Sequence, residues 1–138
     1  MYSELDNLLS KEVTIDSWYD DGFLIAQDIM NKFSNADWIK LSEEVLNKDL
    51  KWQKKLVYCL DNQLIEEELE IISKMLCVKD DELLEMCIDV LRAFDNELGH
   101  SYIKMHPEII SEAKKRMSAV DSVTKMMLKS FLMKFSEC

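Results

Sequence analysis

Histidine and cysteine are the side chains with which this chain could do chemistry near neutral pH, and it has only two histidines and four cysteines. Glu97 and His100 form a Glu-x-x-His, a spacing that places both side chains on one face of a helix. Helical di-iron proteins need two such motifs and two further carboxylates. No second motif occurs, and Gly99 is expected to interrupt the helix that would carry the first. We therefore predict no metal site at Glu97 and His100.

The cysteines also lack a partner for metal chemistry. They form no CxxC pair and have no histidine at ligand spacing, so zinc is not expected. The chain contains no HExxH, GxGxxG, P-loop or GxSxG motif. The sequence therefore predicts a protein that is not an enzyme and that has no cofactor and no metal.

The sequence positions of the cysteines indicate a protein of a reducing compartment. Cys59, Cys77 and Cys87 lie in apolar helical stretches, and the first ten residues are acidic, unlike a signal peptide. We expect free thiols in a cytoplasmic protein, with two disulfides as the alternative. No apolar run approaches the roughly 18 residues that would cross a membrane.

The charge balance bears on the partner. With 27 acidic and 17 basic side chains, the net charge is −10. This charge argues against nucleic acid, whose binding depends on basic patches, and against an anionic membrane. It favours a basic macromolecular partner, although solubility alone is the alternative explanation.

Three of the acidic residues form a stripe. Glu82, Glu85, Asp89, Arg92 and Asn96 follow one another at steps of three and four, which places them along one line of a helix. Like charges at this spacing repel by about a few tenths of a kcal/mol per pair, so stability alone gives little reason for them. We predict that Glu82, Glu85 and Asp89 bind a basic partner; a solvated helix face is the alternative.

The segment Asp80–Asn96 that carries this stripe is apolar on its other sides, so neighbours must cover most of it. We expect it to be the central helix of an all-α protein. Its apolar residues are Leu83, Leu84, Met86, Cys87, Ile88, Val90, Leu91, Ala93 and Phe94.

The remaining chain reads as further helices in one domain over residues 1–138. Helix pairs at Asp37–Asp61, Leu64–Phe94 and Pro107–Phe135 form a weak repeat, whereas 95–105 is expected to be the least regular stretch, with a short turn of helix around Tyr102. Only two glycines and one proline occur, which excludes the turns of an all-β fold. We predict stacked antiparallel helix hairpins, about seven to eight helices in a short HEAT-like solenoid; a compact helical bundle is the alternative.

Aromatic residues mark a possible extension of the contact. Trp18 and Tyr19 stand beside Asp20 and Asp21, a mixture typical of surfaces that receive a basic partner. We predict that Trp18, Asp20 and Asp21 extend the contact, with partial burial of the aromatic rings as the alternative. Trp38 and Trp52 are expected in the core.

The segment from Asp37 to Phe94 resembles the HEAT-like helical immunity proteins of bacterial polymorphic toxin and contact-dependent growth inhibition systems. The resemblance rests on the hairpin rhythm and on the placement of Trp38 and Trp52 in DWIKLSEEVLNKDLKWQKKLVYCLDNQ. It implies a cytoplasmic antitoxin in a one-to-one complex with a cognate toxin domain, often a nuclease. Such a nuclease is basic because its substrate is polyanionic.

Two functions are thus compatible with the sequence. The first is an immunity protein that neutralises a basic toxin through its acidic surface. The second is a non-catalytic helical-repeat adaptor that binds a peptide or a regulatory protein in an apolar groove.

Overall fold

The protein is all-helical, as predicted. The computed structural model describes residues 1–12 and 14–135, and no strand occurs among them. The α-helices are α1 (Tyr2–Ser10), α2 (Ile15–Ser17), α3 (Phe23–Asn31), α4 (Asn35–Glu44), α5 (Leu50–Val57), α6 (Glu66–Met75), α7 (Asp81–Leu91), α8 (Glu97–Met105), α9 (Pro107–Arg116) and α10 (Ser122–Phe135). A π-helical turn (Trp18–Gly22) joins α2 to α3, and 3₁₀ turns follow α4, α7 and α9 at Val45–Asn47, Arg92–Phe94 and Met117–Ala119.

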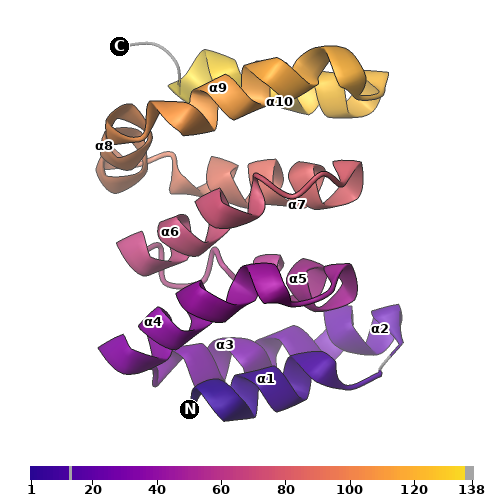
Figure 1. Cartoon of the computed structure of the whole chain (residues 1–138), viewed down its shortest axis with the longest axis vertical. Coiled ribbons are helices and arrows are strands. Elements are labelled where there is room, and N and C mark those ends of the chain that lie inside the picture. Colours follow the sequence, from indigo (N-terminus) through magenta and orange to yellow (C-terminus); the bar gives the residue numbers. More distant parts are fainter. Residues whose placement is uncertain (13, 136–138) are drawn as a thin grey trace.

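The helices are stacked in layers along the long axis of the molecule (Figure 1). The layers are α1 with α3, α4 with α5, α6 with α7, and α9 with α10, while α8 lies at one edge and contacts α6, α9 and α10. Between layers, α5 packs on α7 and α7 packs on α10. The predicted stacking of hairpins is compatible with this arrangement, and its assignment as a HEAT-like solenoid stays a prediction.

The predicted central helix is confirmed. Helix α7 contacts α5, α6 and α10, and the side chains on its covered sides belong to one hydrophobic core that runs through all four layers. The Asp80 carboxylate caps α7 by accepting a hydrogen bond from the Leu83 amide at 2.9 Å. The helix is shorter than predicted, because a 3₁₀ turn replaces its last residues.

The stretch 95–105 is more regular than predicted, because residues 97–105, which include Tyr102, form the helix α8. The Asn96 side chain caps the helix by accepting from the Gly99 amide at 2.8 Å. Gly99 is buried inside the first turn, where an added Cβ would come within 1.9 Å of the Phe94 carbonyl oxygen. Gly99 therefore permits a close approach of two backbones and does not end a helix.

Of the two alternatives for Trp18, the structure supports burial. The π-helical turn places its side chain inside the protein, where it is 4% exposed and lies against Gly22. A Cβ at position 22 would come within 2.6 Å of the Trp18 ring, so the glycine makes room for the indole. Trp38 and Trp52 are buried as predicted.

Among the described residues, no helix combines the length and the apolar character that crossing a bilayer requires.

Candidate binding surfaces

The predicted acidic stripe lies on the surface of α7, but each of its carboxylates has a partner within the chain. Glu82 Oε1 lies 3.4 Å from Lys54 Nζ on α5, and Asp89 Oδ1 lies 3.4 Å from Arg92 Nη1. Since Lys54 and Arg92 balance part of its charge, the stripe attracts a basic partner less than its sequence suggests.

Glu85, the middle residue of the stripe, is half-buried between α7 and α10. Its Oε2 atom accepts a hydrogen bond from the buried hydroxyl of Thr124 at 3.3 Å. Glu85 therefore contributes to the packing of α10 on α7. A charge reversal at this position would disturb the fold as well as the surface.

A further carboxylate, that of Asp61, lies near the Asp89 end of the stripe. Desolvation and the nearby Asp89 carboxylate raise the pKa of Asp61, which follows α5. The two carboxylates thus lie close enough to repel each other.

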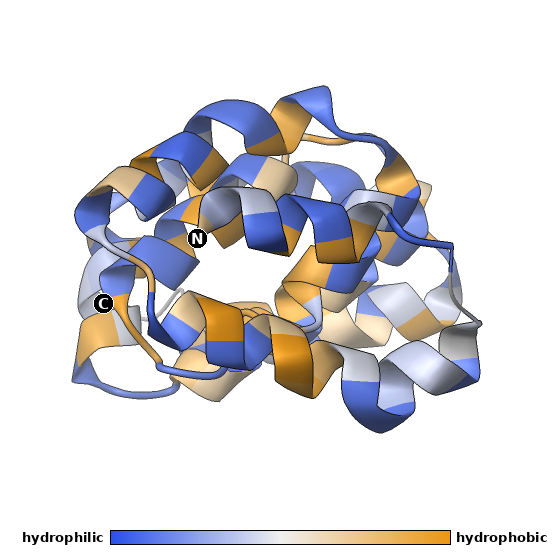
Figure 2. Ribbon diagram, turned by 90° about the horizontal axis from the view of Figure 1, so that it is seen from below, coloured by the Kyte–Doolittle hydropathy of each residue, from blue (hydrophilic) through white to orange (hydrophobic). Residues whose placement is uncertain are grey.

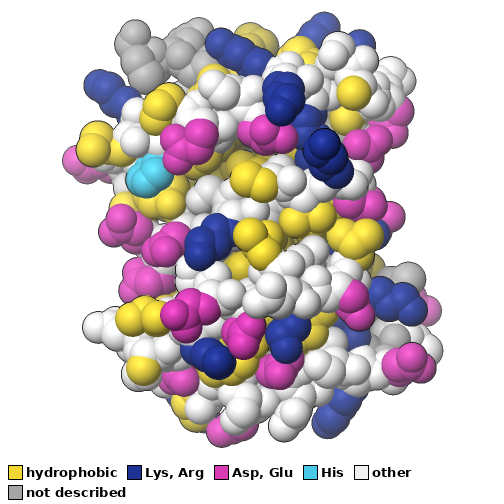
Figure 3. Space-filling model, in the orientation of Figure 1, with side chains coloured by type: hydrophobic (Ala, Val, Ile, Leu, Met, Phe, Trp, Pro, Cys, Tyr) yellow, Lys and Arg dark blue, Asp and Glu magenta, His cyan; other side chains and the backbone are white. Residues whose placement is uncertain are grey.

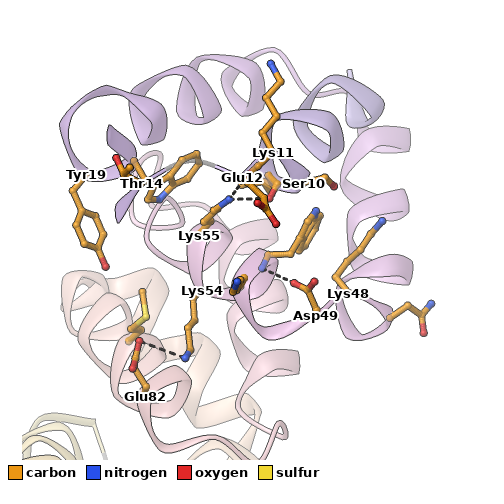
Figure 4. Close-up of a pocket in the computed structure, with 16 residues that line it drawn as sticks. Ser10, Lys11, Glu12, Thr14, Tyr19, Lys48, Asp49, Lys54, Lys55 and Glu82 are labelled. Atoms are coloured by element: carbon orange, nitrogen blue, oxygen red, sulfur yellow. Dashed lines mark hydrogen bonds and ion pairs between the residues drawn. The ribbon is translucent and has the colours of Figure 1, made fainter. Parts of the chain in front are cut away.

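The structure separates the predicted extension into buried and exposed parts. Trp18 is buried, whereas Asp20 and Asp21 are exposed and form no ion pair with any described residue. Tyr19 is the exposed aromatic residue of this turn, and its ring lies 4.7 Å from that of Tyr58 on the neighbouring layer. The structure brings Tyr19 and Glu82 to the rim of one groove (Figure 4).

This groove, of about 910 Å³, is lined by five lysines and three carboxylates. Figure 4 shows how two of the lysines are held. Lys55 donates to the Lys11 and Leu9 carbonyl oxygens at 2.7 and 3.3 Å, and Lys54 reaches Glu82. Lys48 pairs with Asp6 at 3.0 Å, and Lys54 also lies 3.6 Å from Asp80. Lys48 and Lys54 thus neutralise carboxylates of the chain itself, whereas Lys55 is held by backbone carbonyl oxygens.

A second groove, between α4 and α6, has the opposite character. It has a volume of about 300 Å³, and its lining contains Glu43, Glu67 and Glu70 but no basic residue among those described. Ile39, 59% exposed, and the buried Trp38 and Ile71 supply its apolar part. It therefore combines an exposed apolar side chain with a rim of carboxylates.

The carboxylates continue beyond this groove towards the edge where α6 and α9 begin. Burial raises the pKa of Tyr102, and the carboxylates of Glu70, Glu66 and Glu108, which lie near its hydroxyl, raise it further. Figure 3 shows acidic side chains gathered on this side of the molecule. We call this surface the acidic face; its residues are Glu43, Glu66, Glu67, Glu70 and Glu108.

The acidic face has no ionic partner among the described residues. None of its five glutamates lies within ion-pair distance of a lysine, arginine or histidine there, and Glu70 only accepts a hydrogen bond from Ser42 at 3.4 Å. This surface is not evident from the sequence, because Glu66 and Glu67 lie in the first turn of α6, where the helix dipole favours acids in any case. The signal that could have found it is Glu43, an acid in the last turn of its helix, where the helix dipole disfavours negative charge.

His100 and the two buried cysteines make contacts within the fold, whereas the Cys77 side chain is exposed. His100 Nε2 lies 2.7 Å from Asp95 Oδ1, and the imidazole ring stacks on Phe135 at 4.5 Å. Burial raises the pKa of the Cys87 thiol to about 12, and burial also raises that of Cys59. Cys59, Cys77 and Cys87 are free thiols, and Cys138 lies outside the described residues. Among the described residues, no three His, Cys, Asp or Glu side chains form a cluster that could hold a metal ion.

Comparison of the chain with protein-family models, curated proteins and solved structures finds no match.

Proposed function

We propose that this protein is an immunity protein that binds a basic toxin one to one in the cytoplasm and neutralises it through the acidic face. The observation that carries the proposal is a set of five glutamates without an ion pair to the described residues, three of which line a groove with an exposed isoleucine while Glu66 and Glu108 lie beyond it. Protein interfaces commonly have an apolar centre and a polar rim, and this face has both. The three free thiols support residence in a reducing compartment.

Helix stability accounts for only part of the charge of this face. Glu66, Glu67 and Glu108 lie in the first turns of α6 and α9, where the helix dipole favours acids. Glu43 lies at the end of α4, and no basic residue occupies the last turn of that helix. The neighbouring Glu44 is paired with Lys40 at 3.3 Å, whereas Glu43 is not. A basic partner would offset the unfavourable interaction between the Glu43 carboxylate and the C-terminal end of the α4 dipole.

A toxin that acts on nucleic acid fits this surface best. Such an enzyme concentrates lysine and arginine around its substrate groove, because the phosphate backbone dominates its binding energy. Carboxylates arranged around an apolar side chain would occupy that groove and exclude the substrate. The opposite charges would also accelerate association and make its rate depend on ionic strength.

Affinity capture from the cell that encodes the chain tests this proposal. The immobilised protein should retain, at low salt, one basic polypeptide in stoichiometric amount. When that polypeptide is purified and assayed on RNA and DNA, addition of an equimolar amount of this protein should abolish its activity. A captured partner that is not basic, or whose activity is unchanged in the complex, would contradict the proposal and favour an adaptor.

A further inference from the structure

The two end layers of the stack carry opposite charge. Residues 1–34, which form the α1–α3 layer, contain seven acidic and two basic side chains. Residues 107–135, which form the α9–α10 layer, contain six basic and three acidic ones. Although the whole chain has a charge of −10, it therefore has a negative end and a positive end.

The positive end also exposes apolar side chains. Met126 and Met133 on α10 are 72% and 73% exposed, and Val123 on the same helix is exposed too. Their spacing of three and seven residues places them on one side of the helix, opposite the buried Leu128 and Phe131. Lys129 is exposed between the two methionines. The outer side of α10 is thus a basic and apolar surface at the end of the stack.

The negative end has a matching surface. On α3, Leu24 and Ile25 are half-exposed, whereas Ala26 and Met30 are buried towards the core. The exposed Asp28 follows them on the same helix. Figure 2, the view from this end, shows α1 and α3 side by side with hydrophobic stretches along α3. The outer side of α3 is thus an acidic and apolar surface.

We propose that a second copy of this chain docks end to end, with its α1–α3 layer on α10. Layers of stacked helices cover one another's apolar sides, and the end layers of such proteins normally have polar outer faces. Here both ends are apolar and differ in charge, so each end complements the other end of a second copy. This contact joins unlike surfaces and leaves a free end on each copy, so it forms short linear chains of molecules.

The opposite charges of the two end surfaces attract each other only when the surfaces are in contact. The net negative charges of the two copies repel each other over longer distances. At about 0.15 M salt the screening length is about 8 Å, so the long-range repulsion is weakened more than the pairing of Lys129 with acids of α3 such as Asp28. We expect association with a Kd on the order of 100 µM, as suits a small interface.

Sedimentation velocity over a concentration series tests this inference. The wild-type protein should sediment faster as its concentration rises through the Kd. Two double variants, Met126→Glu/Met133→Glu and Leu24→Glu/Ile25→Glu, should each remain monomeric, because each has one end blocked. A mixture of the two should form a dimer, since each variant retains the end that the other lacks. Met105→Glu is the matched control, because Met105 is 75% exposed but lies on α8.

Two results would overturn the inference. A wild-type protein that stays monomeric throughout the series would exclude end-to-end docking. Association that is lost in the α10 variant but retained in the α3 variant would indicate a symmetric dimer through α10. The inference does not depend on the proposed function, because the end surfaces contain none of the residues of the acidic face. Both double variants should therefore still bind the basic partner.

Discussion

At the scale of single residues, Gly99 shows how one position constrains the path of the chain. Its lack of a side chain lets the Phe94 carbonyl approach the first turn of α8. In Gly99→Ala, the new methyl group would overlap that oxygen, so we expect a loss of at least about 2 kcal/mol of unfolding free energy. Urea unfolding measures it, with Ser101→Ala on the exposed side of α8 as the control. Equal stability of the two variants would contradict the close approach.

Glu68 is a buried acid whose protonation is linked to folding. Burial raises its pKa above the ordinary value of 4.5, although the Ile65 and Gln63 amides donate to its oxygens at 3.1 Å. A raised folded-state pKa means that the native state holds the proton more tightly. Its contribution to stability is therefore complete below pH 4.5 and is lost as pH rises through the folded-state pKa.

Glu68→Gln removes this titration and leaves the other carboxyl groups in place. The stability of the wild-type protein minus that of the variant should therefore be smaller at about pH 7 than at about pH 4. Urea unfolding of both proteins at the two pH values measures the difference. A difference that grows with pH would show that the backbone donors outweigh burial.

At the scale of elements, the apolar circumference of α7 was sufficient to predict its central place. A helix that is apolar on three sides can be stable only when neighbours cover those sides, and α5, α6 and α10 do so. The capping residues Ser34 and Asp80 likewise mark the starts of α4 and α7, because their side chains satisfy amides at those ends.

Substitution of Ile88 by alanine tests whether α7 lies at the centre of the core. Its side chain is fully buried, so Ile88→Ala should leave a cavity and cost about 2–5 kcal/mol of unfolding free energy. Val123→Ala, at an exposed position of α10, should cost less than about 0.5 kcal/mol. Thermal and urea unfolding compare them, and a small effect at Ile88 would mean that the interior around α7 is loosely packed.

Other elements could not be predicted, because their signals depend on contacts distant in the sequence. From the sequence, Gly99 is expected to end a helix, and only the structure shows that the Phe94 backbone lies against it. Trp18 looks like a surface aromatic residue until the π-helical turn places it over Gly22. The stripe on α7 could be predicted as a line of charge. Its partners Lys54 and Thr124 lie on other helices, and no local pattern identifies them.

At the scale of the whole molecule, the sequence shows the total charge but not its distribution. The carboxylates of the predicted stripe are partly balanced by Lys54 and Arg92, whereas Glu43 and Glu70 form no ion pair with the described residues, and the nearby Lys74 donates instead to the Ser42 carbonyl oxygen. The candidate partner surface is therefore the acidic face and not the stripe on α7. On this account, binding energy and salt dependence should both reside in the acidic face.

The most direct test is to measure the affinity for the captured basic partner with two charge-reversed variants. Glu43→Lys/Glu70→Lys changes the acidic face, and Glu82→Lys/Asp89→Lys makes the same change of charge on the exposed residues of the stripe. We expect the first variant to lose at least about 100-fold in affinity, whereas the second should stay within about threefold of the wild-type protein. A large loss in the second variant, with the first unchanged, would contradict the account and return the binding site to α7.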